Sequence, residues 1–156
     1  MRRLWRGAGL LVLAQFLGAS IYFLLSGSRR KKSPIPVFID VGPVEDFAPD
    51  SVTLVRRGEF YLNRFADGGF LALSRRCTHL GCAVTWDRER KIFTCPCHAS
   101  SFSRDGSVLK SPAPRPLDLH PLIIEKGRVK IDIGTRRRRT LFSPQQLGYP
   151  AGKQKT

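Results

Sequence analysis

Short runs of alternating or β-rich hydrophobic positions fill the middle of this chain. Gly, Pro, Asp and Asn separate the runs, and residues 67–69 and 126–128 have the composition of hairpin turns. Such short, interrupted runs predict an all-β fold, an antiparallel sandwich or small barrel, with no long helix between residues 36 and 134. The predicted strands are residues 37–41, 52–55, 60–65, 70–74, 83–86, 91–94, 122–125 and 129–133.

The N-terminal pattern is different, because residues 7–25 carry no charge. A stretch of this length can cross a hydrocarbon core of about 30 Å as a helix, and its small residues suit packing on a neighbouring helix. A cleaved signal peptide is the alternative, but its apolar segment is usually about 7–15 residues long. Ala19-Ser20-Ile21 is a poor cleavage site. An uncleaved, single-pass transmembrane helix over residues 1–25 is therefore favoured.

Two further segments flank the predicted β domain of residues 36–134. Residues 26–35 contain Gly, Ser, four consecutive basic residues and Pro, a composition that predicts a flexible hinge. Residues 135–156 include the run Arg136-Arg137-Arg138-Arg139 and are then rich in Gly, Pro and Gln. We expect them to form a basic, disordered tail that could contact anionic lipid or an acidic partner.

The formal net charge of +15 would suit a nucleic-acid-binding protein, but its distribution does not. Residues 34–134 hold 14 Lys and Arg against 12 Asp and Glu, which is a net charge of only +2. The other 13 basic residues lie in the terminal segments. Because the predicted domain has no basic face interleaved with aromatic residues, nucleic acid is not an expected partner.

Two boxes contain all four cysteines and two of the three histidines. They are residues 77–82, Cys-Thr-His-Leu-Gly-Cys, and residues 95–100, Cys-Pro-Cys-His-Ala-Ser. Thiolate and neutral imidazole are the ligands that zinc and iron–sulfur clusters prefer. Two Cys and two His could hold such a centre, and the remaining two Cys, one per box, would be free to form a disulfide.

Two alternatives compete with an iron–sulfur cluster. Zinc sites more often pair Cys with Cys and His with His at short spacing, whereas each box here gives one Cys and one His. Two disulfides without a metal would leave His79 and His98 without a role. On a [2Fe–2S] cluster, imidazole on one iron reduces the negative charge and raises the potential to roughly −150 to +300 mV, so this pattern favours a redox protein.

The boxes resemble the signature of Rieske [2Fe–2S] proteins in the disulfide-bearing form found in cytochrome bc and b6f-type complexes. The resemblance covers about residues 36–134 and includes the turn and proline loop after the second box, where Ser111 replaces the usual Gly. It implies a Rieske-type antiparallel β-sandwich with a cluster-binding subdomain. The implied site is one [2Fe–2S] cluster on Cys77 and Cys95 at the buried iron and His79 and His98 at the exposed iron, with a disulfide between Cys82 and Cys97.

The resemblance also implies roles for residues beside the ligands. Ser100 matches a serine whose hydroxyl donates to a cluster sulfide and raises the potential. Phe102 stands where respiratory high-potential members have Tyr, so the ring is kept and a hydrogen-bond donor is lost. We therefore expect an intermediate potential, suited to menaquinol better than to ubiquinol. Leu80, Gly81 and Pro112 are expected to lie close to the cluster.

The implied function is that of the electron-transfer subunit of a quinol–cytochrome c or plastocyanin-like oxidoreductase, which does not catalyse alone. His79 or His98 would accept a hydrogen bond and a proton from a quinol while the cluster takes one electron. The electron would then pass to a c-type cytochrome haem. A membrane cytochrome b subunit would supply most of the quinol site.

The expected location is a bacterial cytoplasmic membrane. Basic residues on the two sides of residues 7–25 nearly balance, so charge does not orient the helix. A disulfide argues that the Rieske head lies on the oxidising, periplasmic side. Arg2-Arg3-Leu4-Trp5 resembles a truncated twin-arginine signal, which exports folded proteins, and a plain cluster of anchor charges is the equal alternative.

Two other classes of function remain. The small subunit of an arsenite oxidase-like molybdoenzyme has a similar Rieske centre and can carry Phe near the second box, and a neighbouring molybdopterin gene would favour it. A Rieske ferredoxin of a ring-hydroxylating dioxygenase is soluble and lacks the extra cysteine pair. Cys82, Cys97 and the apolar N-terminus therefore count against a ferredoxin.

Overall fold

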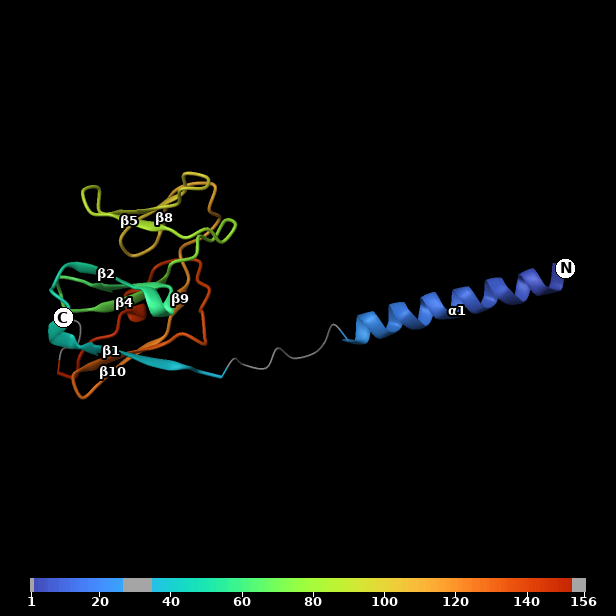
Figure 1. Cartoon of the computed structure of the whole chain (residues 1–156), viewed down its shortest axis with the longest axis horizontal. Helices are drawn as coiled ribbons and strands as arrows, with labels where there is room; N and C mark the ends of the chain where they lie inside the picture. The colour runs from blue at the N-terminus through green and yellow to red at the C-terminus, as the bar shows by residue number, and fades with distance from the viewer. Residues whose placement is uncertain (1, 27–34, 153–156) are drawn as a thin grey trace. The chain divides into compact units, whose positions relative to one another are not determined.

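The structure is a computed structural model that describes residues 2–26 and 35–152, with helix side chains given for residues 8–23. The chain divides into two units, Met1–Ser33 and Pro34–Thr156. Helix α1, Arg2–Ser26, belongs to the first unit (Figure 1). Nearly all of the predicted hinge over residues 26–35 lies outside the described residues, and so do the side chains of the motif at residues 2–5.

Helix α1 contains the uncharged sequence that we predict to be a membrane anchor. Its described side chains are all exposed, including those of Leu10, Leu11, Phe16 and Phe23. Among the described residues, no helix is both long enough and apolar enough to cross a membrane. The helical conformation of this stretch is confirmed, whereas its attachment to a membrane stays a prediction.

The second unit, which we call the head, contains three antiparallel sheets (Figure 1). The middle sheet has the order β2-β3-β4-β9, with strands Ser51–Val55, Phe60–Arg64, Phe70–Ser74 and Leu119–His120. Successive side chains of a strand point to opposite faces. In β3 and β4 both faces are buried, which explains why residues 60–62 and 70–73 are apolar without interruption.

One face of the middle sheet packs against the sheet β1-β11-β10, formed by Phe38–Pro43, Arg128–Asp132 and Leu122–Glu125. Two short 3₁₀ helices, η1 (Val44–Asp46) and η2 (Arg56–Gly58), lie in the connections on either side of β2. The two sheets bury apolar side chains between them, and full burial of one large apolar side chain stabilises the fold by roughly 1.5–3 kcal/mol. The core between these sheets contains Val44, Phe47, Phe60, Leu62, Phe70, Ala72, Val129 and Ile131.

The other face of the middle sheet carries a small subdomain, inserted between β4 and β9. Its sheet has the order β5-β6-β7-β8, formed by Thr85–Asp87, Ile92–Thr94, Ser101–Phe102 and Val108–Lys110. Tyr61, Leu71 and Leu73 of the middle sheet share a second core with Phe93 and Phe102 of the subdomain. The mostly β fold is confirmed, whereas β7, β8 and β9 lie in none of the predicted strands.

The prediction of a disordered tail is wrong for residues 135–152. Arg137 and Leu119 exchange two backbone hydrogen bonds, and Gly148 exchanges two with Phe70. Arg139 is buried at 7% exposure, and the 3₁₀ helix η3 (Pro144–Gln146) follows it. The basic composition suggested solvation, but these contacts form with parts of the head that are distant in sequence. The β-bridges fix the segment at the edge of the middle sheet.

His120 is a buried histidine of the middle sheet. It lies in β9 and is only 5% exposed, with its ring beside Phe60 and its Nδ1 3.2 Å from the backbone oxygen of Asp132. Burial lowers the pKa of His120, and the charge of Arg136 lowers it further, while the Asp132 backbone oxygen and carboxylate raise it. The buried ring is therefore held in its neutral form.

The stability of the head is expected to fall as the pH falls from 7 to 5. Because the pKa of His120 is lower in the folded than in the unfolded chain, the unfolded chain binds more protons in this range and gains stability from acid. His120→Asn keeps a donor at this position but does not titrate, so its loss of stability should be smaller. Urea unfolding of both proteins at the two pH values measures the difference; equal losses would contradict the assignment.

Candidate metal centre

The first box forms a loop between β4 and β5. The Cys77 N–H donates to Cys82 O at 2.8 Å, and the Gly81 N–H donates to Cys77 O at 3.0 Å. Gly81 has φ +84°, a left-handed conformation that favours glycine. The backbone therefore turns sharply around Cys77 and presents His79 and Leu80 at the outside of the loop, where Leu80 is 71% exposed.

The second box, between β6 and β7, repeats this hydrogen-bond pattern. The Cys95 N–H donates to Ser100 O at 2.8 Å, and the Ala99 N–H donates to Cys95 O at 3.1 Å. Ala99 has φ +56°, the left-handed region occupied by Gly81 in the first loop. Two loops of one design thus face each other, and each buries its first cysteine.

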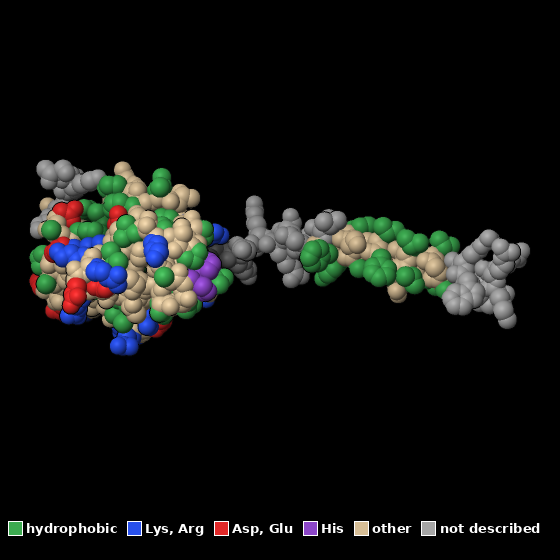
Figure 2. Space-filling model, turned by 90° about the horizontal axis from the view of Figure 1, so that it is seen from above, with side chains coloured by type: hydrophobic (Ala, Val, Ile, Leu, Met, Phe, Trp, Pro, Cys, Tyr) green, Lys and Arg blue, Asp and Glu red, His purple; other side chains and the backbone are tan. Residues whose placement is uncertain are grey.

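The two loops bring together two pairs of possible metal ligands, one of cysteines and one of histidines. Cys77 and Cys95 are free thiols, 4% and 3% exposed. The rings of His79 and His98 lie with their centroids 4.7 Å apart, edge to face. His79 is half-buried and His98 is exposed, and Figure 2 shows histidine side chains gathered in one patch on the surface of the head.

An unsatisfied polar atom marks the place where a ligand group is needed. Nδ1 of His79 is buried and has no hydrogen-bond partner in the part of the chain that the structure describes. Burying a polar atom without a partner costs free energy, so such an atom calls for a ligand. A metal bound at this nitrogen would satisfy it. The residues present therefore fit a [2Fe–2S] cluster with two buried thiolates and two outer imidazoles.

The Cys77 thiol lies at the inner end of this group. Burial raises its pKa, the backbone N–H of His79 and the Ser100 hydroxyl lower it, and contact with the Cys95 thiol raises it further. Two thiols in contact cannot both ionise easily, because their charges repel each other. A metal centre between them would remove this conflict by holding both as thiolates.

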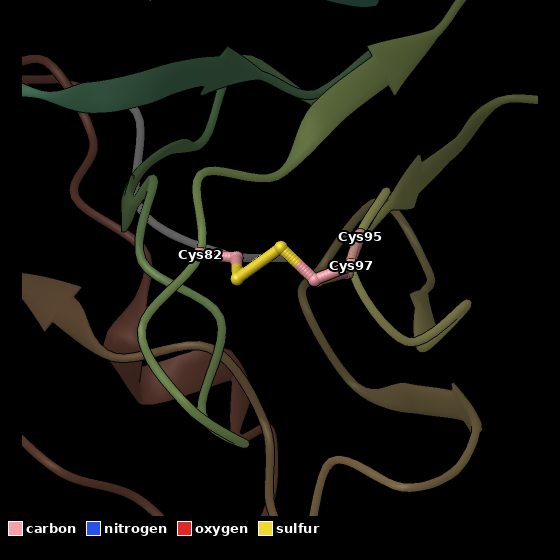
Figure 3. A group of neighbouring side chains, drawn as sticks. All are labelled: Cys82, Cys95 and Cys97. Carbon is pink, nitrogen blue, oxygen red and sulfur yellow. A yellow bond between two sulfur atoms is a disulfide. The ribbon is translucent and has the colours of Figure 1, made fainter.

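The Cys82–Cys97 disulfide is present, as the resemblance implied, and closes a sequence separation of 15 residues. Figure 3 shows it crossing from one loop to the other beside Cys95. The sulfurs of Cys82, Cys95 and Cys97 lie within 4.8 Å of one another. The two bridged sulfurs carry no thiolate, so this trio does not replace the Cys/His set as a metal site.

Ser100 and Phe102 follow the second loop and are both fully buried. The Ala113 N–H donates to the Ser100 hydroxyl oxygen at 3.0 Å, which leaves the hydroxyl proton free to donate toward the Cys77 sulfur. Phe102 pairs with Phe93 in the β6–β7 register. Pro112 is exposed in the loop that precedes Ala113, and the contact of this loop with the second box is made by Ala113.

Thr78 and Arg115 are site residues that the sequence analysis did not identify. The Thr78 hydroxyl donates to the backbone oxygen of Arg115 at 2.6 Å, and so it ties the first box to the proline loop. In the sequence, the only indication of this contact is that Thr78, between Cys77 and His79, carries a hydroxyl that can donate a hydrogen bond. Its partner is 37 residues away, and no local pattern predicts it.

The fold and the donor set are those of a small β protein whose two Cys/His loops fit a metal centre. The family model for the Rieske [2Fe–2S] domain matches residues 37–122. The chain therefore belongs to the Rieske [2Fe–2S] domain family, and its cofactor is a Rieske-type [2Fe–2S] cluster.

Several relatives share this chain's sequence. The cytochrome b6-f complex iron-sulfur subunit of Chlorobaculum tepidum is 29% identical over 143 residues, which are 85% of this chain and 73% of that protein. The chloroplastic subunit of the same name from Bigelowiella natans is 41% identical over 85 residues, 53% of this chain. The chain covers 34% of the length of the Bigelowiella protein and 39% of the subunit of Synechococcus sp. strain JA-3-3Ab.

Solved structures agree with the fold. The cyanobacterial plasma membrane Rieske protein PetC3 of Synechocystis PCC 6803 is 28% identical, with a TM-score of 0.50 over 60% of this chain and 98% of that one. The quaternary ammonium Rieske monooxygenase CntA is 21% identical, with a TM-score of 0.51 over 63% of this chain and 32% of that one, and this likeness concerns the fold alone.

Proposed function

We propose that this chain is the Rieske subunit of a cytochrome b6f- or bc-type complex. In this role it takes one electron and one proton from a quinol at a cytochrome b subunit and passes the electron to a c-type cytochrome haem. The observation that carries the proposal is the adjacent pair His79 and His98, one half-buried and one exposed, over two buried thiols. The similarity to b6-f iron-sulfur subunits over 85% of this chain supports the choice of complex.

Each proposed ligand has a distinct part. Cys77 and Cys95 would hold the buried iron, His79 and His98 would hold the exposed iron, and the bound cluster would supply a one-electron redox couple. The Nδ1 of His79, which is buried and has no hydrogen-bond partner among the described residues, would be the atom that binds the metal. The other ring nitrogen, Nε2, is then left for a group outside the chain. When the ring carries no proton on Nε2, this nitrogen can accept a hydrogen bond from the quinol hydroxyl and take the proton as the electron leaves the quinol.

The surface around these histidines suits docking of an apolar quinol head into a partner protein. Leu80 is 71% exposed directly beside His79. Covering such a side chain at an interface removes apolar surface from water and excludes water from the proton transfer. Cys82 and Cys97 hold the two loops together, so the histidine pair keeps its geometry during docking.

We further propose that α1 attaches the chain to a bacterial cytoplasmic membrane, with the head on the periplasmic side. The uncharged stretch over residues 7–25 and the disulfide support this placement. The chain should remain with the membranes after a high-salt wash, and protease added to intact spheroplasts should remove the head. Release by salt would contradict the anchor, and a head protected from protease would contradict the sidedness.

Purification from the native membrane tests the function. A tagged chain extracted in mild detergent should bring b-type and c-type haem spectra with it, and menaquinol should reduce the bound cytochrome only while the cluster is intact. Reduced protein should give the low-temperature EPR signal of a Rieske centre. Co-purification of a molybdopterin enzyme without cytochrome b would contradict the proposal and favour the arsenite oxidase-like alternative.

Phe102→Tyr is expected to raise the midpoint potential. The new hydroxyl would donate toward a ligand sulfur and stabilise the more negative, reduced state. A hydrogen bond to a charged group contributes roughly 1.5–3 kcal/mol, which for a one-electron couple sets an upper limit of about 130 mV on the shift. Redox titration followed by EPR measures the shift. Phe38→Tyr on strand β1 is the control, because the middle sheet separates the sheet of Phe38 from the subdomain that carries the two boxes. An unchanged midpoint would remove Phe102 from the determinants of the potential.

A further inference from the structure

An open hollow of about 390 Å³ lies against the first box, and arginines dominate its lining. Arg76, Arg115, Arg136 and Arg138 border it, together with the single carboxylate of Asp118. Cys77, Thr78 and Gly81 of the first box also line it, whereas the two histidines and the disulfide do not. The proposed electron transfer gives the four arginines of this surface no role.

Separate elements bring these arginines to one place. The backbone of Arg76 forms a β-bridge with Ala83, and its guanidinium lies over Gly81, where a Cβ would be 3.3 Å from Nη2. Arg136 and Arg138 come from the C-terminal segment. The hydrogen bonds between Arg137 and Leu119 fix that segment, and alternation along it puts both neighbours of Arg137 at the hollow.

Three of the four charges have no ion-pair partner in the part of the chain that the structure describes. Arg115 forms an ion pair with Asp118, so this pair is close to neutral. Among the described residues, Arg76, Arg136 and Arg138 have no carboxylate oxygen within 4.0 Å. Like charges held together by separate backbone anchors repel one another, and an anion bound between them would relieve this repulsion.

We propose that this hollow, which we call the arginine hollow, binds a phosphate group. Guanidinium groups match phosphate oxygens with paired N–H donors, and three of them lining one concave site favour a compact oxyanion with several acceptor oxygens. Free phosphate and the phosphate of an anionic lipid head group share this chemistry. The proposal is independent of the electron-transfer function, because binding is measured without turnover.

Calorimetry on the full-length, cluster-loaded chain tests the proposal at constant ionic strength. Two probes are titrated: inorganic phosphate, and monomeric dihexanoylphosphatidylglycerol below its micellar concentration. The double variant R136Q/R138Q removes two exposed charges of the hollow, and R56Q/R88Q removes two exposed charges elsewhere on the head. We expect saturable binding that weakens by roughly tenfold or more in R136Q/R138Q, the effect of losing charge-assisted hydrogen bonds, and by less than about twofold in the control.

Each outcome decides the proposal. Loss of inorganic phosphate binding in R136Q/R138Q alone supports it with free phosphate as the ligand, and the same pattern for the short-chain lipid only supports it with a lipid head group. R76Q, from another element, should weaken the same probe. Equal weakening in the control variant, or no saturable binding of either probe, would overturn it. Binding of a hexaglutamate peptide without binding of either phosphate probe would also overturn it and assign the hollow to an acidic protein.

Discussion

Cys95→Ala is expected to abolish the [2Fe–2S] cluster while the sheets of the head remain folded. Cys95 is 3% exposed, and it belongs to the only pair of free thiols that the described residues contain. The other two cysteines are joined in the disulfide, so no thiolate replaces it. Iron content, visible absorption and low-temperature EPR should fall to background, and far-UV circular dichroism should keep its β-sheet spectrum.

The double variant Cys82→Ala/Cys97→Ala is the matched control. It removes one cysteine from each loop, but it leaves all four proposed ligands in place. In the loop-entropy model, a disulfide across about 15 residues adds about 3 kcal/mol to the free energy of unfolding. The double variant should therefore have a lower melting temperature and still show the Rieske spectrum. If Cys95→Ala kept the Rieske spectrum and the control lost it, the proposed ligands would be wrong, and the cluster would belong to Cys82 and Cys97.

The sequence predicted the parts of the fold that depend on local pattern. Strands β3 and β4 are buried on both faces, and their uninterrupted apolar runs made them visible. The same holds for the turn at residues 67–69, where the Gly68 N–H donates to Phe65 O. Strands β7 and β9 have only two residues each, which is too short for any periodicity. They exist because neighbouring strands pair with them.

The candidate site divides in the same way. The cysteines and histidines could be found because each loop holds its ligands within a few residues of sequence. The contacts that orient the loops could not, since Thr78 bonds to Arg115 and Ser100 to Ala113 across longer separations. The burial of His120 is not visible in the sequence either, because it depends on Phe60 and Asp132 from other strands.

The C-terminal segment shows how composition can mislead. Four consecutive arginines suggest a solvated tail, yet the fourth one is buried. The Arg139 side chain donates to Leu117 O at 2.8 Å, to Gln146 Oε1 at 2.9 Å and to Asp105 O. Burial lowers the pKa of Arg139 to about 10, while the charges of Asp105 and Asp118 raise it, so the guanidinium stays protonated at neutral pH. A single charged side chain thus links this segment to two loops of the head.

Gly106 is part of the same arrangement. It has φ +83°, and a Cβ there would lie 2.5 Å from Nη2 of Arg139 and 2.9 Å from Leu73. Only glycine allows the turn at Asp105 to approach the guanidinium this closely. The Leu117 N–H also donates a hydrogen bond of 2.9 Å to Gly106 O in this turn. The C-terminal segment, the turn and the end of the proline loop therefore form one connected structure.

Arg139→Met is expected to destabilise the head strongly. Methionine keeps much of the buried aliphatic volume but leaves the carbonyl oxygens of Leu117 and Asp105 without their donor. Buried unsatisfied acceptors cost roughly 1–3 kcal/mol each, so the melting temperature should fall on the order of 10 °C. The C-terminal segment should also detach, because the β-bridges of Arg137 and Gly148 alone hold it less firmly.

Arg138→Met is the internal control for this prediction, since it is the same change one residue away on an exposed side chain. An exposed substitution is usually within about 0.5 kcal/mol of wild type. Thermal unfolding and limited proteolysis at residues 140–152 compare the two proteins, and cleavage should accelerate in Arg139→Met alone. Equal stability and equal cleavage would mean that the segment contributes nothing to the fold. A selective effect would mean that the fourth arginine of the run holds the C-terminal segment on the head, while its exposed neighbours Arg136 and Arg138 remain available to bind an anion.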